Sequence, residues 1–177
     1  MNVKNTLETI ADRRSIRVYT PARVPDEHVK AILEATRLAP SAANRQPVHF
    51  VVVRDAERKR RLAEACAAQH FIADADLVIA CIGLPAQSQK WYQVDAAIAM
   101  QHLVLAAASL GYATCWIGAF SEAAVKQILG VPDDARIVAL TPLGVAGERP
   151  APRGRKTHRE VFSLERFGAP LPAEWVG

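Results

Sequence analysis

Three arginines and a serine lie within five residues near the start of the chain: Arg13, Arg14, Ser15 and Arg17, with Ile16 between them. Arginine presents forked N–H donors that match phosphate oxygens, and serine adds a neutral donor. The cluster therefore predicts a phosphate or other anion site. Arg13 and Arg14 also stand at the end of a predicted helix, where cations stabilise the last turn. Residue types alone leave both readings open.

A second basic cluster, Arg153, Arg155 and Lys156, lies about 140 residues further along the chain. It is either a solvated tail or an arm that returns to the first cluster. A phosphate held by the first cluster still has oxygens that need donors, and Arg153 and Arg155 would supply them.

Two further segments carry groups that bind ligands. The loop Pro40 to Pro47 contains Asn44 and Gln46, whose amides each offer a donor and an acceptor, as reading a planar heterocycle requires. An ordinary polar turn has the same composition. At Ile117-Gly118 the glycine lets the backbone approach a ligand and present an N–H group.

The elements that must position these residues alternate between helical and extended periodicity. Helices are predicted over 6–13, 26–38, 55–69, 94–110 and 121–129, and strands over 49–53, 77–84, 113–117 and 137–145. No repeat or linker divides residues 1–177. We therefore expect one α+β or three-layer domain with a structureless arm over 147–177 that could wrap a partner subunit.

The predicted helix over 94–110 is apolar nearly all round and needs covering on every side. A second copy of the chain would cover one side, which predicts a homodimer; a helix surrounded within one monomer is the alternative. Gln101 and His102 interrupt the apolar run, which is also too short to span a bilayer. No membrane association is expected.

Composition argues against several classes of protein. Cys66, Cys81 and Cys115 stand singly on apolar stretches, and the five histidines lack metal-ligand spacing, so neither disulfides nor a metal site are expected. No secretion signal opens the chain, which predicts a cytoplasmic protein.

The net charge of +4 lies in local patches without interleaved aromatic residues, so nucleic acid is not an expected partner. The run Arg58 to Arg61 is interpreted as a solvated helix face.

In their order and spacing these motifs resemble the nitroreductase family of flavoproteins. Arg13-Arg14-Ser15-Ile16-Arg17 is similar to the family's opening R-R-S-x-R, and Pro40 to Pro47 to its P-S-x-x-N-x-Q-P loop. Asp95-Ala96-Ala97, Trp116-Ile117-Gly118 and Arg153-x-Arg155 follow in the family's order. The resemblance spans about Ile10 to Phe162.

This resemblance implies a three-layer α/β/α sandwich around a mostly antiparallel sheet, with the C-terminal arm exchanged in a homodimer and FMN at the interface. It implies that Arg13, Ser15, Arg153 and Arg155 hold the FMN phosphate, and that Arg14 and Arg17 reach the ribityl chain and the pyrimidine edge. The other implied contacts are Ile117 and Gly118 near flavin N5 and O4, Gln69 at the pyrimidine, and Pro40, Ser41, Ala42 and Asn44 from the other subunit.

The implied activity is transfer of hydride from NADH or NADPH through flavin N5 to a small electron-poor acceptor, such as a nitroaromatic or a quinone, with ping-pong kinetics and no catalytic side chain. Trp91 and Tyr92 would form a lid over the flavin, or else simply pack in the core. A specialised reaction such as dehalogenation, dehydrogenation or enone reduction stays open, as does a non-catalytic module that binds flavin or polyanions.

The chain departs from the family pattern at three positions. Val48 replaces a common Trp, Gln69 stands where Asn is frequent, and Ile117 stands where some members have an acid.

Overall fold

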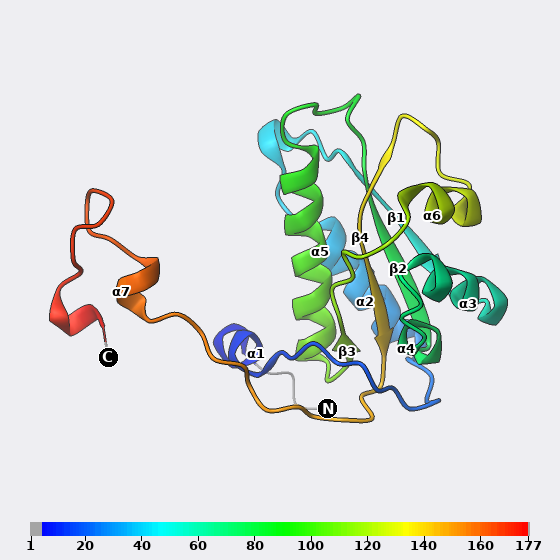
Figure 1. Cartoon of the computed structure of the whole chain (residues 1–177), viewed down its shortest axis with the longest axis horizontal. Helices are drawn as coiled ribbons and strands as arrows, with labels where there is room; N and C mark the ends of the chain where they lie inside the picture. The colour runs from blue at the N-terminus through cyan, green and yellow to red at the C-terminus, as the bar shows by residue number, and fades with distance from the viewer. Residues whose placement is uncertain (1–4, 177) are drawn as a thin grey trace.

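Four strands form one antiparallel sheet in the order β1-β2-β4-β3 in the computed structural model, which describes residues 5–176 (Figure 1). The strands are β1 (Val48–Val53), β2 (Leu77–Gly83), β3 (Ala113–Thr114) and β4 (Arg136–Gly144). β2 pairs with β1 from Val53↔Val78 to Val48↔Gly83, and β4 covers its other side. β2 is therefore the centre of the sheet, as its apolar sequence predicts.

The side chains of β2 alternate between two apolar layers, as the period of a strand requires. Leu77, Ile79 and Cys81 pack against helices α2 (Asp26–Arg37) and α5 (Tyr92–Ser109). Val78 and its even-numbered neighbours Ala80 and Ile82 pack with α3 (Ala56–Ala65), α4 (Phe71–Asp74) and α6 (Glu122–Leu129) on the other face. The three-layer α+β expectation is confirmed.

The central helix α5 packs against the sheet, α2 and the short helix α1 (Thr6–Asp12). Met100, Leu103 and Val104 are buried, whereas Val94 at the start of the helix is 46% exposed. One monomer thus covers most of the helix and leaves part of its first turn open. Figure 1 shows that α5 lies on the side of the sheet that faces the arm.

The strand expected over 113–117 is interrupted after Thr114, for a reason visible in β4. The register of β3 and β4 places Cys115 opposite Pro142, which has no N–H to donate. Cys115 O therefore receives no hydrogen bond from Pro142, and Cys115 N donates to the side chain of Thr141, at Oγ1, over 3.2 Å. Pairing resumes at Ile117, which exchanges two backbone hydrogen bonds with Leu140.

The segment after α1 runs along the β3 edge of the sheet and joins the start of the arm. Ile16 N donates to Thr114 O at 3.0 Å, and Gly147 N donates to Val18 O at 2.8 Å. Tyr19 is buried and donates its hydroxyl to Ile16 O. These bonds place residues 13–20 between the sheet and the residues that open the arm.

The arm leaves the sheet at Gly147 and carries α7 (His158–Val161) clear of the other helices (Figure 1). The expectation of a structureless tail is wrong in detail, because α7 and a 3₁₀ turn, η2 (Ala173–Trp175), interrupt it. Thr157 and Glu160 form a capping box at the start of α7. That T-x-x-E signature is present in the sequence.

The helix expected over 55–69 ends early, at Ala65. Ala67 and Ala68 adopt left-handed conformations, with φ of 57° and 53°, and these turn the chain into the unexpected helix α4. Alanine rarely takes this conformation, so no residue type marks the end of the helix here. The other predicted elements agree with the structure to within a few residues.

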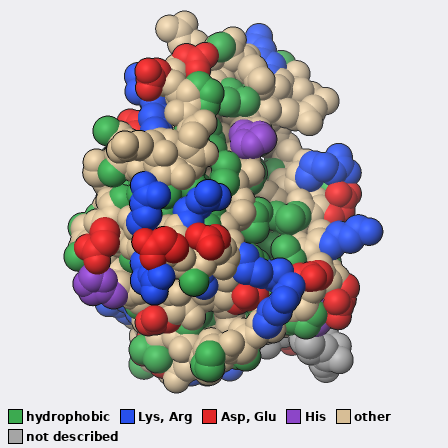
Figure 2. Space-filling view, turned by 90° about the vertical axis from the view of Figure 1, so that its right-hand side faces the viewer, with side chains coloured by type: hydrophobic (Ala, Val, Ile, Leu, Met, Phe, Trp, Pro, Cys, Tyr) green, Lys and Arg blue, Asp and Glu red, His purple; other side chains and the backbone are tan. Residues whose placement is uncertain are grey.

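Charges of both signs intermix on the side of the molecule opposite the arm (Figure 2). On α3 the Arg60 guanidinium pairs with Glu57 at 2.6 Å, and both side chains are exposed. This arrangement fits a solvated face. Among residues 5–176, no helix has both the length and the apolar character needed to cross a membrane.

Candidate functional site

A cavity between the N-terminal segment and the arm contains both arginine clusters predicted to bind phosphate. From the first cluster it is lined by Arg13, Arg14, Ser15 and Arg17, and from the arm by Arg153 and Arg155. Pro150, Ala151 and Pro152 form the wall between them. Residues about 140 positions apart in the sequence thus converge on one space, which we call the arginine cleft.

The guanidinium groups of the arginine cleft lack acidic partners within residues 5–176. Arg13, Arg17 and Arg153 form no ion pair there, and Arg155 donates only to the carbonyl oxygens of Arg153 and Gly154. Arg14 Nη1 donates to Ala11 O at 2.7 Å and so caps the end of α1. Several positive charges gathered without counter-charges favour an anionic ligand.

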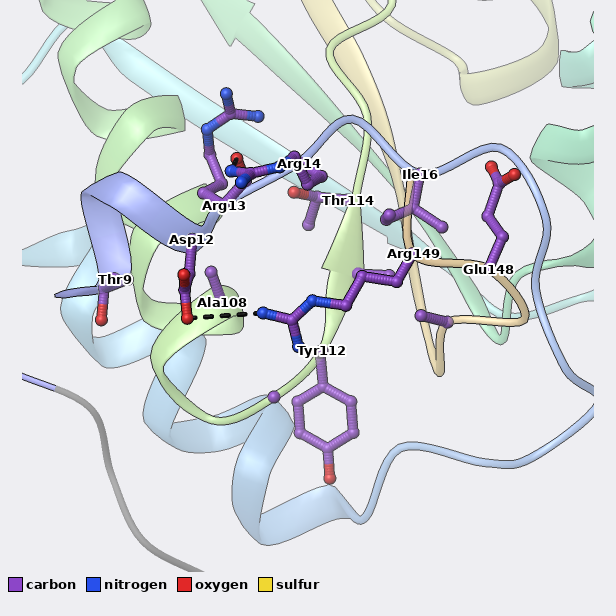
Figure 3. A pocket seen from close by; sticks show the side chains of 13 residues that line it. Thr9, Asp12, Arg13, Arg14, Ile16, Ala108, Tyr112, Thr114, Glu148 and Arg149 are labelled. Atoms are coloured by element: carbon purple, nitrogen blue, oxygen red, sulfur yellow. Dashed lines mark hydrogen bonds and ion pairs between the residues drawn. The ribbon is translucent and has the colours of Figure 1, made fainter. Parts of the chain in front are cut away.

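Two acidic side chains fix the start of the arm beside the first cluster. Glu148 Oε1 accepts a hydrogen bond from Arg17 N at 2.9 Å. Asp12 Oδ2 lies 3.4 Å from Arg149 Nη2, and Figure 3 shows this pair bridging α1 and the arm in a neighbouring cavity. Arg13 points away from that pair in the same view.

The thiol of Cys115 lies beneath the arginine cleft. Burial raises its pKa, and this shift is opposed by the positive charges of Arg17 and Arg13 and by a hydrogen bond with Ser15. Cys115 is buried, with 3% of the residue exposed, and its thiol stays protonated at neutral pH. It acts as a packing group under the cleft, as expected for a lone apolar cysteine.

Gln69, Ile117 and Gly118 come together where the turn after α3 meets the strand-to-helix junction before α6. Gln69 Nε2 donates to Cys66 O at 2.8 Å and lies 3.5 Å from Ala119 O. The Gly118 N–H has no acceptor among residues 5–176, and a Cβ added at Gly118 would meet nothing within 4 Å. The backbone at Gly118 is therefore open on the side where a Cβ would stand.

The loop over 40–47 lies at the other end of α5 from α1 and the segment that follows it (Figure 1). Its 3₁₀ turn, η1 (Ala42–Asn44), is fixed by Asp95, whereas Arg13 and Arg14 share a cavity with Ala108 beside the end of α5. At about 1.5 Å per residue, roughly 20 Å of helix separate Asp95 from Ala108. Pro40, Ser41, Ala42 and Asn44 are thus remote from the phosphate-binding arginines of their own chain.

Trp91 and Tyr92 stand at the start of α5, at the same end as this loop. Tyr92 is half-buried, and its ring lies so close to Gly83 that a Cβ there would clash with it. Trp91 is 41% exposed, with Lys90 Nζ 5.4 Å from its ring centroid. The Tyr92 ring packs against the sheet, whereas part of the Trp91 side chain is exposed to solvent.

Two residues that sequence reasoning missed shape these sites. Glu148 ties the arm to Arg17, and Asp95 ties the 40–47 loop to α5. Asp95 carried a signal, since it is an acid in an otherwise apolar helix. Glu148 carried none, because its partner is a backbone N–H 131 residues away.

The fold and the site define an α+β protein whose N-terminal segment and C-terminal arm enclose a cavity lined by arginines. The family model described as Nitroreductase family matches residues 10–85 and 68–145. A Bacillus subtilis protein named FMN reductase, NAD(P)H, is 33% identical over 187 residues, which cover 93% of this chain and 75% of that protein. The chain belongs to the nitroreductase family.

Solved structures agree with this assignment. A nitroreductase family protein from Clostridium novyi NT superposes with a TM-score of 0.79 at 32% identity, covering 94% of this chain and 97% of that one. An NADPH:FMN oxidoreductase from Vibrio harveyi, complexed with NAD+, gives a TM-score of 0.84 at 27% identity, covering 92% of this chain and 78% of that one.

Proposed function

We propose that this chain is an FMN-dependent oxidoreductase that passes electrons from NADH or NADPH to a small electron-poor acceptor, such as a nitroaromatic or a quinone. The observation that carries the proposal is the convergence of Arg13, Ser15, Arg153 and Arg155 on one cavity, which has no acidic side chain in its lining among residues 5–176. The names of the relatives, FMN reductase and NADPH:FMN oxidoreductase, support the same cofactor and donor.

The residues of the arginine cleft fit the phosphate of FMN. The three terminal oxygens of a phosphate monoester require several donors, and the cleft offers the guanidinium groups of Arg13, Arg153 and Arg155 with the Ser15 hydroxyl. Arg14 uses one nitrogen to cap α1 and keeps other N–H groups for the ribityl chain. The Arg17 guanidinium, which forms no ion pair among residues 5–176, would reach the pyrimidine edge.

When bound, FMN supplies the hydride and two-electron chemistry. The chain's own groups then orient and polarise it. The free N–H of Gly118 is suited to donate to an acceptor atom on the ring edge, with Ile117 as an apolar neighbour. A guanidinium near the pyrimidine favours negative charge on that side of the ring. None of these roles requires a side-chain acid or nucleophile.

We further propose that two copies of the chain form the working unit and exchange their arms. Val161, Phe162, Phe167 and Trp175 on the arm are all more than half exposed, with Phe167 at 104%. Exposed apolar side chains of this density mark a contact surface. Because the 40–47 loop and the arginine cleft lie at opposite ends of α5, the loop is placed to serve the cleft of a second copy.

The test of assembly is the molar mass of the full chain and of a variant ending at Lys156, measured by light scattering during size-exclusion chromatography. The truncated chain keeps both arginine clusters and loses the apolar arm. A dimeric full chain with a monomeric truncated chain is expected. The same oligomeric state for the two chains contradicts the arm exchange.

The test of the cofactor is the absorbance of the purified protein, with FMN added to any apo-protein. We expect a flavin spectrum that bleaches when NADH or NADPH is added without oxygen and recovers on addition of a quinone or a nitroaromatic. A protein that takes up no FMN overturns the proposal. A protein that binds FMN without bleaching overturns the electron donor.

A further inference from the structure

Asp95 is the only buried acid among residues 5–176, and it holds the 40–47 loop. It is the fourth residue of α5 and is 3% exposed. Its Oδ1 accepts a hydrogen bond from Ala42 N at 3.0 Å. Its Oδ2 is buried without a partner in the described part of the chain, on the wall of a cavity beside Ser41 and Gln46.

A buried carboxylate with one hydrogen bond is a poor way to stabilise a fold. The cost of removing the charge from water exceeds the gain from a single bond, and an apolar residue would suit the surroundings of Ala96 and Ala99 better. The position in the first turn of α5 offsets only part of that cost through the helix dipole. The specific contact with the loop is what Asp95 provides.

The loop needs such a contact because its backbone is strained. Ala43, Asn44 and Gln46 adopt positive φ angles of 51°, 54° and 51°. Left-handed backbone at residues other than glycine is unfavourable and persists only where its surroundings enforce it. Within the loop, Ser41 Oγ accepts from Gln46 N at 2.9 Å. Asp95 supplies a fixed point outside the loop.

We propose that Asp95 is a positioning residue, whose carboxylate clamps the strained 40–47 loop through Ala42 N and thereby sets the affinity of the protein for FMN. The inference rests on the proposed function, because that function makes FMN the ligand that Ser41, Ala42 and Asn44 contact. The clamp itself is a property of the apo-protein and has its own measurement.

The first experiment compares Asp95→Ala, which removes the acceptor, with Asp95→Asn, which keeps an acceptor oxygen. The dissociation constant for FMN is titrated on apo-protein by the quenching of FMN fluorescence. Hydrogen bonds to charged groups contribute enough that Asp95→Ala should weaken binding about tenfold or more. Asp95→Asn should restore binding to within about threefold of wild type.

The second experiment measures the loop directly, by limited trypsin digestion of the apo-protein followed by mass spectrometry. Arg45 is exposed in the loop, so the rate of cleavage after Arg45 reports how firmly the loop is held. Asp95→Ala should raise this rate several-fold relative to cleavage in the arm, and Asp95→Asn should leave it near the wild-type rate.

Asp55→Ala is the matched control. Asp55 Oδ1 also accepts a hydrogen bond from a backbone N–H, that of Arg58 at 2.8 Å, but at the start of α3. Its removal should lower overall stability and leave FMN affinity and Arg45 cleavage unchanged. Equal effects of the two alanine variants would show that Asp95 acts only through general stability.

A double-mutant cycle tests the path of the effect and covers the case in which Asp95→Ala does not fold. Ala42→Pro removes the donor from the loop side, and Ser41 already has the extended conformation, φ −141° and ψ 157°, that precedes proline. If Asp95 acts through Ala42 N, Ala42→Pro alone, which keeps Asp95, should raise Arg45 cleavage, and adding Asp95→Ala should change it no further. Additive effects overturn the clamp.

The outcomes separate the two proposals. A wild-type protein without FMN affinity defeats the proposed function, while the cleavage rates still decide the clamp. A wild-type protein that binds FMN, together with a folded Asp95→Ala variant of unchanged affinity or unchanged Arg45 cleavage, overturns the positioning role alone.

Discussion

The side chain of Glu148 accepts a hydrogen bond from the backbone N–H of Arg17, 131 residues earlier in the chain. The same short stretch also pairs Gly147 N with Val18 O. Together these bonds fix the first residues of the arm beside the first arginine cluster. They place Arg153 and Arg155 opposite Arg13 and hold the arginine cleft in shape.

Glu148→Ala should therefore weaken FMN binding about three- to tenfold, because the arm loses one of the bonds that orient its arginines. FMN titration of the apo-protein measures this. Glu174→Ala, an exposed acid further along the arm, is the control and should have no effect. An unchanged dissociation constant for Glu148→Ala contradicts the role of this bond.

The double variant Arg13→Ala with Arg153→Ala should lose FMN while remaining folded. Each guanidinium contributes a charge-assisted bond to phosphate, so the combined loss is at least about a hundredfold in affinity. Riboflavin, which has no phosphate, should bind wild type and variant alike. Arg58→Ala with Arg61→Ala removes two exposed arginines of α3 as the control. Equal FMN affinity for both pairs would refute the phosphate assignment.

Two glycines should respond differently to an added methyl group. Gly83→Ala drives a Cβ into the Tyr92 ring and should destabilise the apo-protein by about 1–3 kcal/mol in urea unfolding. Gly118→Ala meets nothing within 4 Å and should leave apo-protein stability within about 0.5 kcal/mol. It should nevertheless weaken FMN binding, because the methyl group occupies the space proposed for the ring. Unimpaired FMN binding by Gly118→Ala argues against that placement.

Stability should fall at high pH through the buried thiols. Burial raises the pKa of Cys66 to about 11 and that of Cys81 to about 12. The unfolded chain releases these protons near pH 8.5, about where free cysteine ionises, so the folded state binds more protons above that pH. The stabilisation is complete below the unfolded pKa and is lost as pH rises toward the folded one.

Urea unfolding between about pH 8 and pH 11 measures this loss. Cys66→Ala removes one of the two titrations, so its free energy of unfolding should fall less steeply than that of wild type. Lysine and tyrosine residues titrate equally in both proteins and cancel in the comparison. Parallel pH profiles for the two proteins would show that the Cys66 thiol carries no such shift.

Hydrophobic periodicity predicted most of the fold because the buried elements must be apolar along nearly their whole length. The seven residues of β2 are all apolar or glycine and all buried, and α5 is apolar on nearly every face. Either pattern identifies an element at the centre of a layered protein. The grouping of the arginines was predictable as well, because two distant basic clusters make sense together only around one anion.

The details that escaped prediction depend on which residues meet in three dimensions. Ala67 and Ala68 turn the chain without any glycine to mark the turn. The gap in β3 follows from Pro142 standing opposite Cys115, which only the register reveals. The contact between Asp95 and Ala42 likewise joins residues 53 positions apart, so neither residue predicts its partner.

The length of α5 determines how the parts of a flavin site would be divided between the subunits of an assembly. Since the cleft and the loop sit at opposite ends of that helix, each flavin site in an exchanged pair would draw its phosphate-binding half from one polypeptide and its loop from the other. A subunit with a damaged cleft and a subunit with a damaged loop would then rebuild one sound site between them. Each complete flavin site would thus need both subunits, and two different defective alleles would complement each other.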